Sequence, residues 1–319
     1  MNVKYVITQP ELARIAGVRN QAIAQQAQKL GLTSTQIGNR TAYGPSSVRA
    51  LLEQRGFKYP KQVISFQMLK GGSTKTSCGF HLAVRLNQYG AKVLVVDADG
   101  QANMSSSFGC PPNGEEIVLF HVIKGEAQIE DAIVRITDGL DLIASSFDNS
   151  VIDTVVFQTR QNIKRMISDL IAPIRNNYDF IIFDCNPSLS ALNIAIALAS
   201  DLVILPVNPD DYSKQGLEKT LDEFSRMSTQ YEKNIEFRLL YTLHDAREAT
   251  SRKYLIEYGS KYEDRMFNSI IRRNADVKTA IDQKCTVFDL KKAAARPDFD
   301  AFALEILQFP ENLKGAGNA

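Results

Sequence analysis

The fold is decided by the stretch Lys70-Gly71-Gly72-Ser73-Thr74-Lys75-Thr76-Ser77, which lies between an apolar run at 63–66 and a helical pattern closed by Gly90. A strand, a glycine-bearing loop and a helix N-terminus form a cradle for phosphate, because backbone N–H groups and the helix dipole point at the anion. In such a loop Lys75 reaches the β- and γ-phosphates of a nucleotide, and Thr76 holds Mg²⁺. The sequence therefore predicts a nucleoside triphosphate site formed by all eight residues of the stretch.

The loop departs from the ordinary Walker pattern G-x-x-x-x-G-K-[ST], because Leu69 and Thr74 occupy the positions of its two glycines. It fits the deviant form K-G-G-x-x-K-[ST], in which Lys70 is a second lysine that cannot fold back easily onto its own nucleotide. The loop resembles that of the ParA/MinD group of P-loop ATPases. The resemblance implies that Lys70 crosses a dimer interface to the partner's phosphates, and that both Lys70 and Lys75 serve catalysis.

Two apolar runs of the parallel-strand type end in aspartates. Residues 92–96 lead into Asp97 and Asp99, and residues 180–183 lead into Asp184. The carboxyl ends of parallel strands face the ligand crevice of an open α/β sheet. One aspartate at a solvated strand end is common and would mean little. Three aspartates at strand ends that share a sheet edge with a phosphate loop favour a functional site.

The remaining pattern predicts the fold class. Further apolar runs at 202–206 and 237–241 alternate with helical patterns at 163–174 and 215–227. This alternation is typical of an α/β protein with a doubly wound, mostly parallel sheet and helices on both faces. We expect this body to span residues 61–312 and to be followed by a flexible tail at 313–319.

Length and composition indicate a globular protein. The chain has 319 residues and 35.5 kDa, enough for a large core in one or two domains. No apolar stretch approaches the ~20 residues that span a bilayer, and the N-terminus lacks a signal-peptide pattern. The cysteines form no C-x-x-C pair, which argues against a zinc site and suits a reducing compartment. We therefore expect a cytoplasmic protein; its cysteines are Cys78, Cys110, Cys185 and Cys285.

The net charge of +1 hides an asymmetry along the chain. Residues 1–61 hold nine Lys or Arg and two acidic residues, a net charge of +7, which leaves about −6 for the rest. A small basic module joined to a slightly acidic larger one suggests that the module meets a polyanion.

The pattern of residues 1–60 is typical of a winged helix-turn-helix module. The segment 8–11 has the sequence of a capping box and opens a short helix that Gly17 ends. A second helix, at about 20–30, is expected to bury Ile23, Ala27 and Leu30. Residues 33–44 are expected to form a polar wing, followed by a helix at 46–55.

The second helix exposes side chains that suit base edges and phosphates. The same segment would also suit a helical dimerisation cap with a solvated polar face. We favour DNA binding because the charge asymmetry agrees with the helical pattern; the residues expected to contact DNA are Asn20, Gln21, Gln25 and Lys29, with Gln28 beside them.

From about residue 62 to 307 the chain resembles ParA/Soj-type DNA partition ATPases. The basic module in front resembles the N-terminal extension of larger plasmid ParA proteins. The matching segments are the deviant loop, Asp97-x-Asp99-x-Gln101, Asp184-x-x-Pro187-Ser188, Leu205-Pro206-Val207, Asp245-Ala246-Arg247 and Arg273-Asn274.

The resemblance implies roles for particular residues. Asp97 and Asp184 would help Thr76 to hold Mg²⁺ through water, and Asp99 would orient the water that attacks the γ-phosphate of ATP. Pro206 and Asn274 would lie beside the nucleotide. DNA without sequence preference would meet basic residues in the later part of the body, namely Arg247, Arg252, Arg272 and Arg273.

The resemblance also implies partners. The expected unit is an ATP-dependent homodimer that works on the nucleoid in the cytoplasm, has its slow hydrolysis stimulated by a ParB-like adaptor, and does not contact a membrane. The N-terminal module would bind the chain's own operator and make the protein an autorepressor.

Three positions depart from the family pattern. Thr74 replaces the usual glycine before the loop lysine, and Gly100 replaces the usual proline after Asp99. A β-branched residue tolerates a positive φ poorly, so we expect the loop at Thr74 to take another conformation or to accept strain. Asp276 stands near the place of the family's DNA-contacting arginine.

Four other functions compete with partition. A MinD-like membrane-cycling ATPase would need a basic amphipathic helix at its end, which residues 302–311 do not provide. A nitrogenase-type reductase would need a cluster context that Cys110 and Cys185 lack. A ParA relative that positions a protein cargo, and a transcription factor that uses ATP only as a ligand, both remain open alternatives.

Overall fold

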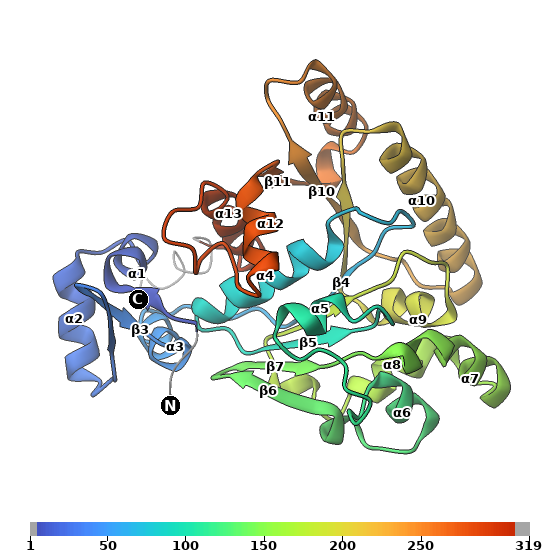
Figure 1. Ribbon diagram of the computed structural model, residues 1–319, viewed down its shortest axis with the longest axis horizontal. Coiled ribbons are helices and arrows are strands. Elements are labelled where there is room, and N and C mark those ends of the chain that lie inside the picture. The colour runs from blue at the N-terminus through green and yellow to red at the C-terminus, as the bar shows by residue number, and fades with distance from the viewer. Residues whose placement is uncertain (1–4, 310–319) are drawn as a thin grey trace.

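The computed structural model describes residues 5–309, so the tail predicted at 313–319 lies outside the described residues. At its centre is an eight-stranded sheet in which all neighbours run parallel except the antiparallel pair at one edge (Figure 1). The strands, in spatial order, are β11 (Met266–Arg272), β10 (Phe237–His244), β9 (Leu202–Val207), β4 (Gln62–Phe66), β8 (Phe180–Asp184), β5 (Val93–Asp97), β7 (Leu140–Ile143) and β6 (Ile133–Thr137).

Helices cover both faces of the sheet, because successive strand residues point to opposite sides and are apolar on both. Ile64 and Phe66 of β4 face one layer, whereas Val63 faces the other. The first layer contains α4 (Lys75–Gln88), α5 (Asn103–Ser107), α12 (Ala275–Asp282) and α13 (Arg296–Ile306). The second contains α6 (Leu119–Lys124), α7 (Ile152–Thr159), α8 (Ile163–Ile171), α9 (Ala191–Ala199), α10 (Asp211–Tyr231) and α11 (Ala249–Lys261).

The predicted doubly wound, mostly parallel sheet is thus confirmed. Strands β6, β7 and β11 were not predicted, and they lie at the two edges of the sheet. Within residues 5–309, no helix has the length and apolar character needed to cross a bilayer.

The N-terminal segment forms a small module with a three-stranded antiparallel sheet. Gly17 has a φ of +65°, which glycine adopts at low cost, and it turns the chain after the first helix. The predicted helices and wing are present, whereas DNA binding by the module stays a prediction. The elements are β1 (Ile7–Thr8), α1 (Gln9–Ile15), α2 (Asn20–Lys29), β2 (Thr35–Ile37), β3 (Arg40–Tyr43) and α3 (Pro45–Glu53).

Two local predictions for the module are wrong. Thr8 makes no side-chain hydrogen bond at the N-terminus of α1, so the capping box does not form. Its acidic member, Glu11, forms an ion pair with Arg85 instead, because a buried guanidinium needs a carboxylate more than a helix end near water needs a cap. Leu30 is 38% exposed rather than buried, since it follows the last residue of α2.

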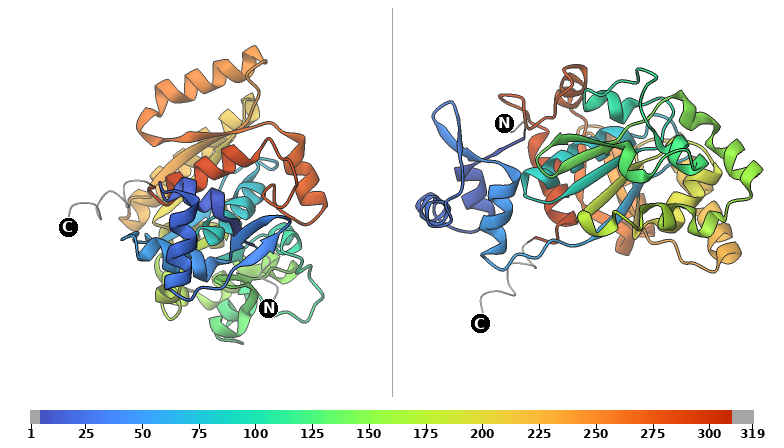
Figure 2. Two further views of the ribbon diagram at one scale, coloured as in Figure 1. Left: turned by 90° about the vertical axis from the view of Figure 1, so that its left-hand side faces the viewer. Right: turned by 90° about the horizontal axis from the view of Figure 1, so that it is seen from below.

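The module packs directly on the body rather than hanging from a linker (Figure 2). One apolar core contains Leu12 and Leu51 of the module together with Leu86 of α4 and Phe302 of α13. An ion pair of 2.5 Å between Arg49 Nη1 and Asp179 adds a polar tie. The predicted boundary at residue 60 falls in the connection between α3 and β4, but the core continues across it.

Candidate nucleotide site

The loop between β4 and α4 is open toward solvent and shaped for phosphate. Gly72 has a φ of +73°, and neither Gly71 nor Gly72 has a heavy atom within 4 Å of the position that a Cβ would take. The backbone therefore leaves room for an anion, as the N-terminus of a helix requires for phosphate binding. A cavity of about 390 Å³ lies over the loop and is lined by residues 71–77 together with Asp99, Gln101, Asn103 and Pro187.

Thr74 accepts strain rather than changing the loop conformation. It has a φ of +62° and a ψ of +12°, which is the left-handed region that a β-branched residue rarely adopts. Its hydroxyl donates a hydrogen bond to the Ser73 carbonyl at 2.6 Å and lies 3.1 Å from Thr242 Oγ1. Thr242 donates in turn to Asn208 Oδ1 at 2.7 Å. These contacts offset part of the ~1–2 kcal/mol that a left-handed L-residue costs.

Lys75 stands at the first position of α4 and points back over the loop. Its ammonium lies 3.4 Å from the carbonyl oxygen of Lys70 and 3.4 Å from Ser73 Oγ, and its side chain is buried. Burial lowers the pKa of Lys75, an effect that the nearby Asp184 carboxylate opposes. A buried ammonium held by long contacts to neutral groups is well placed to take a phosphate oxygen as its partner.

Thr76, Asp97 and Asp184 meet at the carboxyl ends of β5 and β8. The Thr76 hydroxyl donates to Asp184 Oδ2 at 2.6 Å, and Asp97 pairs with Asp184 across the two strands. Asp97 accepts hydrogen bonds from the Ser105 N–H and hydroxyl at 2.8 and 2.7 Å. Asp184 Oδ1, in contrast, is buried and has no hydrogen-bond partner.

An orphaned carboxylate oxygen next to a threonine hydroxyl fits Mg²⁺. This ion takes oxygen ligands, keeps several waters, and is usually held by one or two carboxylates together with substrate phosphates. Within the described residues, no three His, Cys, Asp or Glu side chains gather into a site that would hold a metal alone. The donor set therefore suits a metal that arrives with a nucleotide; Thr76 and Asp184 would hold it, with Asp97 behind them.

Burial of the two aspartates predicts a pH dependence of stability in the absence of Mg²⁺. Burial, and secondarily the charge of Asp97, raises the pKa of Asp184 to about 8, whereas an unfolded aspartate titrates near 3.8. Between pH 3.8 and about 8, Asp184 therefore carries a proton in the native state and not in the unfolded state. The contribution of Asp184 to the free energy of unfolding should therefore fall as the pH rises from about 4 to about 8, by up to ~1.4 kcal/mol per pH unit.

Urea unfolding at pH 5 and pH 8 without metal measures this slope. Asp184→Asn should flatten the slope, because the amide does not titrate. Ser188→Ala, a change in the exposed loop after β8, serves as the control and should retain it. A slope that Asp184→Asn leaves unchanged contradicts the raised pKa of Asp184, because the contributions of other groups, such as His81, whose pKa burial lowers to about 4, cancel in this comparison.

Asp99 lines the cavity beside the loop, as expected for a residue that orients water. Its carboxylate accepts the Gln101 N–H at 3.0 Å, and its backbone carbonyl accepts the Ser145 hydroxyl at 2.7 Å. The structure also explains Gly100. A Cβ at this position would overlap the Ser150 hydroxyl and stand 3.3 Å from the Ser150 nitrogen, so a proline would not fit without a shift.

Lys70 does not line the cavity over its own loop. Its ammonium forms an ion pair of 2.5 Å with Asp210, whose carboxylate also accepts the Ser213 N–H at the start of α10. The ammonium lies 6.0 Å from the ring centroid of Tyr212, which is 75% exposed. In the single chain Lys70 is thus directed away from the nucleotide site; that it acts across a dimer stays a prediction.

Two predicted nucleotide contacts lie outside the cavity lining. Pro206 is buried inside β9, paired with Leu240 of β10. Asn274 is the N-cap of α12, and its side chain accepts the Asp276 N–H at 2.8 Å. Contact of either residue with a nucleotide stays a prediction.

Sequence reasoning missed Asn208, which supports the loop. Its amide donates to the Gly72 carbonyl at 3.4 Å, while its oxygen accepts the Thr242 hydroxyl. A signal was available, since Asn208 directly follows the apolar strand β9, just as Asp97 and Asp184 close theirs.

The predicted DNA contacts of the body lie together at the carboxyl ends of β10 and β11. The Arg273 N–H donates to the His244 carbonyl at 2.9 Å, which joins the two strand ends. Each arginine is already engaged: Arg247 with Asp245 at 2.7 Å, Arg252 with the Ala246 carbonyl, Arg272 with Asp298 at 2.6 Å, and Arg273 with Glu248 at 3.5 Å. The predicted contacts of the module, Asn20, Gln21, Gln25 and Lys29, are all exposed on α2.

Comparisons with known proteins agree with this geometry. The AAA_31 family model, described as an AAA domain, matches residues 61–237. The chain is 28% identical over 243 residues to the chromosome partitioning protein ParA of Caulobacter vibrioides, covering 74% of this chain and 91% of that protein. It is 28% identical over 221 residues to the sporulation initiation inhibitor protein Soj of Bacillus subtilis, covering 69% and 87%.

Solved structures share the fold. The ATP complex of a Cyanothece McdA variant superposes with a TM-score of 0.70 at 20% identity, covering 79% of this chain and 97% of that chain. A plasmid partition protein from Borrelia burgdorferi bound to AMPPNP superposes with a TM-score of 0.63 at 25% identity, covering 78% and 98%. Since the family model spans more than half of the chain, the protein belongs to the AAA_31 family and is a ParA/Soj-type P-loop ATPase.

Proposed function

We propose that this protein is a DNA partition ATPase that hydrolyses ATP to ADP and phosphate with Mg²⁺. Its ATP-bound homodimer binds nucleoid DNA without sequence preference in the cytoplasm, and a ParB-like adaptor stimulates its slow hydrolysis. The N-terminal module binds the chain's own operator and represses its gene. Support comes from ParA and Soj relatives that align with more than two thirds of the chain.

The observation that carries this proposal is that two lysines five residues apart in the loop lie in different places. Lys75 lies in the cavity over the loop, beside Asp184 and its unpartnered oxygen. Lys70 lies outside that cavity and is held by Asp210. A loop with one lysine for its own nucleotide and one directed elsewhere suits an enzyme that completes its site only in a dimer.

Loss of the Asp99 carboxylate tests the proposed cycle. Asp99→Ala should lower phosphate release by about a hundredfold, because it removes the group that positions the attacking water. The variant should also persist on random-sequence DNA with ATP, where the wild type dissociates as it hydrolyses. Asp222→Ala, an exposed aspartate on α10, is the control. A wild-type rate for Asp99→Ala would assign this role to another residue.

Operator binding is tested on α2, because deleting the module would expose the core it shares with α4 and α13. Gln21→Ala combined with Gln25→Ala should abolish DNase protection of the fragment directly upstream of the gene for this chain. Binding to a random duplex with ATP should persist, since phosphate contacts carry no sequence information. If the double variant protects the upstream fragment like the wild type, the module is better described as a dimerisation cap.

A second candidate is an ATPase that positions a protein cargo on the nucleoid. The geometry of the nucleotide site suits this function as well as partition, since the site holds the nucleotide and not the cargo. The two functions predict different adaptors: a sequence-specific DNA-binding protein for partition, and a cargo-bound protein for positioning. Stimulation of phosphate release by one and not the other distinguishes them.

A further inference from the structure

A cavity of about 510 Å³ lies where the N-terminal module meets the body. Glu11 of α1, together with Ile37 and Arg40 of the wing hairpin, lines one side of it, and Phe288 and Lys291 of the loop between α12 and α13 line the other. Figures 1 and 2 show this loop beside the module. The wing and the loop are therefore neighbours in space, although about 250 residues separate them in the chain.

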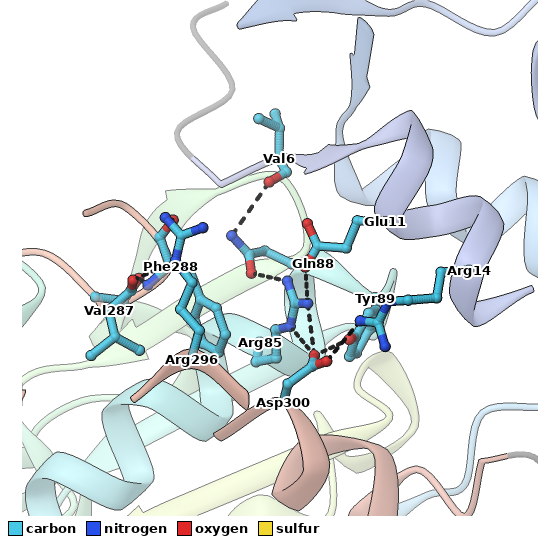
Figure 3. A network of polar contacts seen from close by, with 11 residues as sticks. Val6, Glu11, Arg14, Arg85, Gln88, Tyr89, Val287, Phe288, Arg296 and Asp300 are labelled. Carbon is cyan, nitrogen blue, oxygen red and sulfur yellow. Dashed lines mark hydrogen bonds and ion pairs between the residues drawn. The ribbon is translucent and has the colours of Figure 1, made fainter. Parts of the chain in front are cut away.

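A buried polar network fixes this junction (Figure 3). The guanidinium of Arg85 is 2% exposed, donates to Glu11 and to Asp300, and lies between two rings, with centroids 4.3 Å away for Tyr89 and 4.5 Å for Phe288. Gln88 donates to the Val6 carbonyl at 3.4 Å. A buried charge with this many partners does not leave its place at low cost, so the module cannot swing freely.

The loop itself is held in the same way. Arg296, at the start of α13, donates to the carbonyls of Val287 at 2.9 Å, Phe288 at 3.0 Å and Leu290. Asp289 caps the preceding turn by accepting the Thr286 N–H at 2.8 Å. The residues that follow, Lys291 and Lys292, are thereby presented from a fixed backbone.

Three exposed cations at this junction, unlike the buried Arg85, have no acidic partner within the described residues. Arg40, Lys291 and Lys292 are exposed, and within residues 5–309 none of them forms an ion pair. The acidic residues nearby are engaged elsewhere, Glu11 by Arg85 and Asp289 by its turn. This contrasts with the arginines at the ends of β10 and β11, which already have partners. Unpaired, exposed cations on a rigid surface suit a phosphate backbone.

We infer that the wing and the 287–292 loop form one DNA-binding surface, in which Lys291 and Lys292 of the body hold phosphates of the same duplex that α2 and the wing contact. The inference rests on the operator binding proposed above. A duplex that contacts α2 and Arg40 would extend over the 287–292 loop, because this loop borders the wing across the cavity. Operator affinity then depends on residues about 250 positions outside the helix-turn-helix segment.

The test uses the full chain and the DNA fragment directly upstream of its gene. Lys291→Gln combined with Lys292→Gln should weaken binding roughly tenfold or more at 0.1 M salt, and should lower the slope of log K against log salt by about two, one for each lost phosphate contact. Hydroxyl-radical protection should shorten at the edge of the site while its centre stays protected. Lys164→Gln combined with Lys219→Gln, two exposed lysines on α8 and α10, is the matched control.

The outcomes separate this inference from the proposed function. If the wild type and the control bind the fragment and the Lys291/Lys292 variant binds with the same affinity, salt slope and protected length, the shared surface does not exist. A wild type that protects no specific sequence overturns the operator binding proposed above and, with it, this inference, but leaves the ATPase function untouched. A uniform loss of protection without a change of salt slope indicates a merely structural role for the loop and also contradicts the inference.

Discussion

Replacing Lys75 by alanine should abolish ATP binding, with a loss of affinity of at least about a hundredfold. The ammonium is buried at the start of α4, and its present contacts are long and neutral. Phosphate oxygens would therefore be the strong partners that it gains in this cavity. Without the Lys75 ammonium, the triphosphate would keep its hydrogen bonds to the backbone N–H groups of the loop. It would lose the positive charge that pairs with its phosphate oxygens.

Calorimetric titration with ATP and Mg²⁺ measures this effect. Lys164→Ala, an exposed lysine on α8, provides the control and should bind like the wild type. Thermal unfolding checks that the variant is folded, since removal of Lys75 leaves Asp184 buried without a nearby cation. An affinity for ATP within threefold of the wild type would contradict the assignment of Lys75 to the phosphates.

Replacing Lys70 by alanine should separate nucleotide binding from dimerisation. The side chain lies outside the cavity over its own loop, so ATP affinity should stay within about threefold of the wild type. Hydrolysis should fall by about 10³-fold or more, because a positive group delivered in trans is worth roughly 10³–10⁵ in phosphoryl transfer. Stability should change little, since the lost ion pair with Asp210 is partly exposed and such pairs contribute at most about 1 kcal/mol.

Much of the nucleotide site could be predicted from sequence because its parts are local. The loop, Lys75 and Thr76 belong to one strand–loop–helix unit. Asp97 and Asp184 end strands that pair in register, so the rule for the carboxyl ends of parallel strands places them together. The buried strands are apolar on both faces, and this pattern by itself indicates a parallel sheet.

Other features depend on partners distant in sequence. Lys70 forms an ion pair with Asp210, which is 140 residues away in the sequence. Thr74 contacts Thr242, which is 168 residues away. Arg85 is an ordinary polar residue in the pattern of α4, yet it is buried because Asp300 and Glu11 converge on it. That convergence also explains the missing capping box, since Glu11 cannot serve both Thr8 and Arg85.

The edges of the sheet were harder to predict for a different reason. β6 is five residues long, is not fully buried at any position and runs antiparallel to β7, so it lacks the continuous apolar run of a central strand. β7 is buried and parallel to β5, but it has only four residues and Asp141 interrupts its apolar run. The N-terminal module could be predicted only in part. Its helices follow from local residue spacing and from Gly17. Its contact with α4 and α13, and the surface that it shares with Lys291, depend on segments that are far apart in the chain.

In the proposed dimer, two chains complete each other's ATP sites through Lys70. Sedimentation of the wild type and of Lys70→Ala, each with ATP and Mg²⁺ and each without, tests it most directly. We expect that only the ATP-loaded wild type sediments as a dimer of about 71 kDa, twice the 35.5 kDa chain, while Lys70→Ala binds ATP and stays a monomer. A Lys70→Ala variant that dimerises and hydrolyses ATP like the wild type would contradict it.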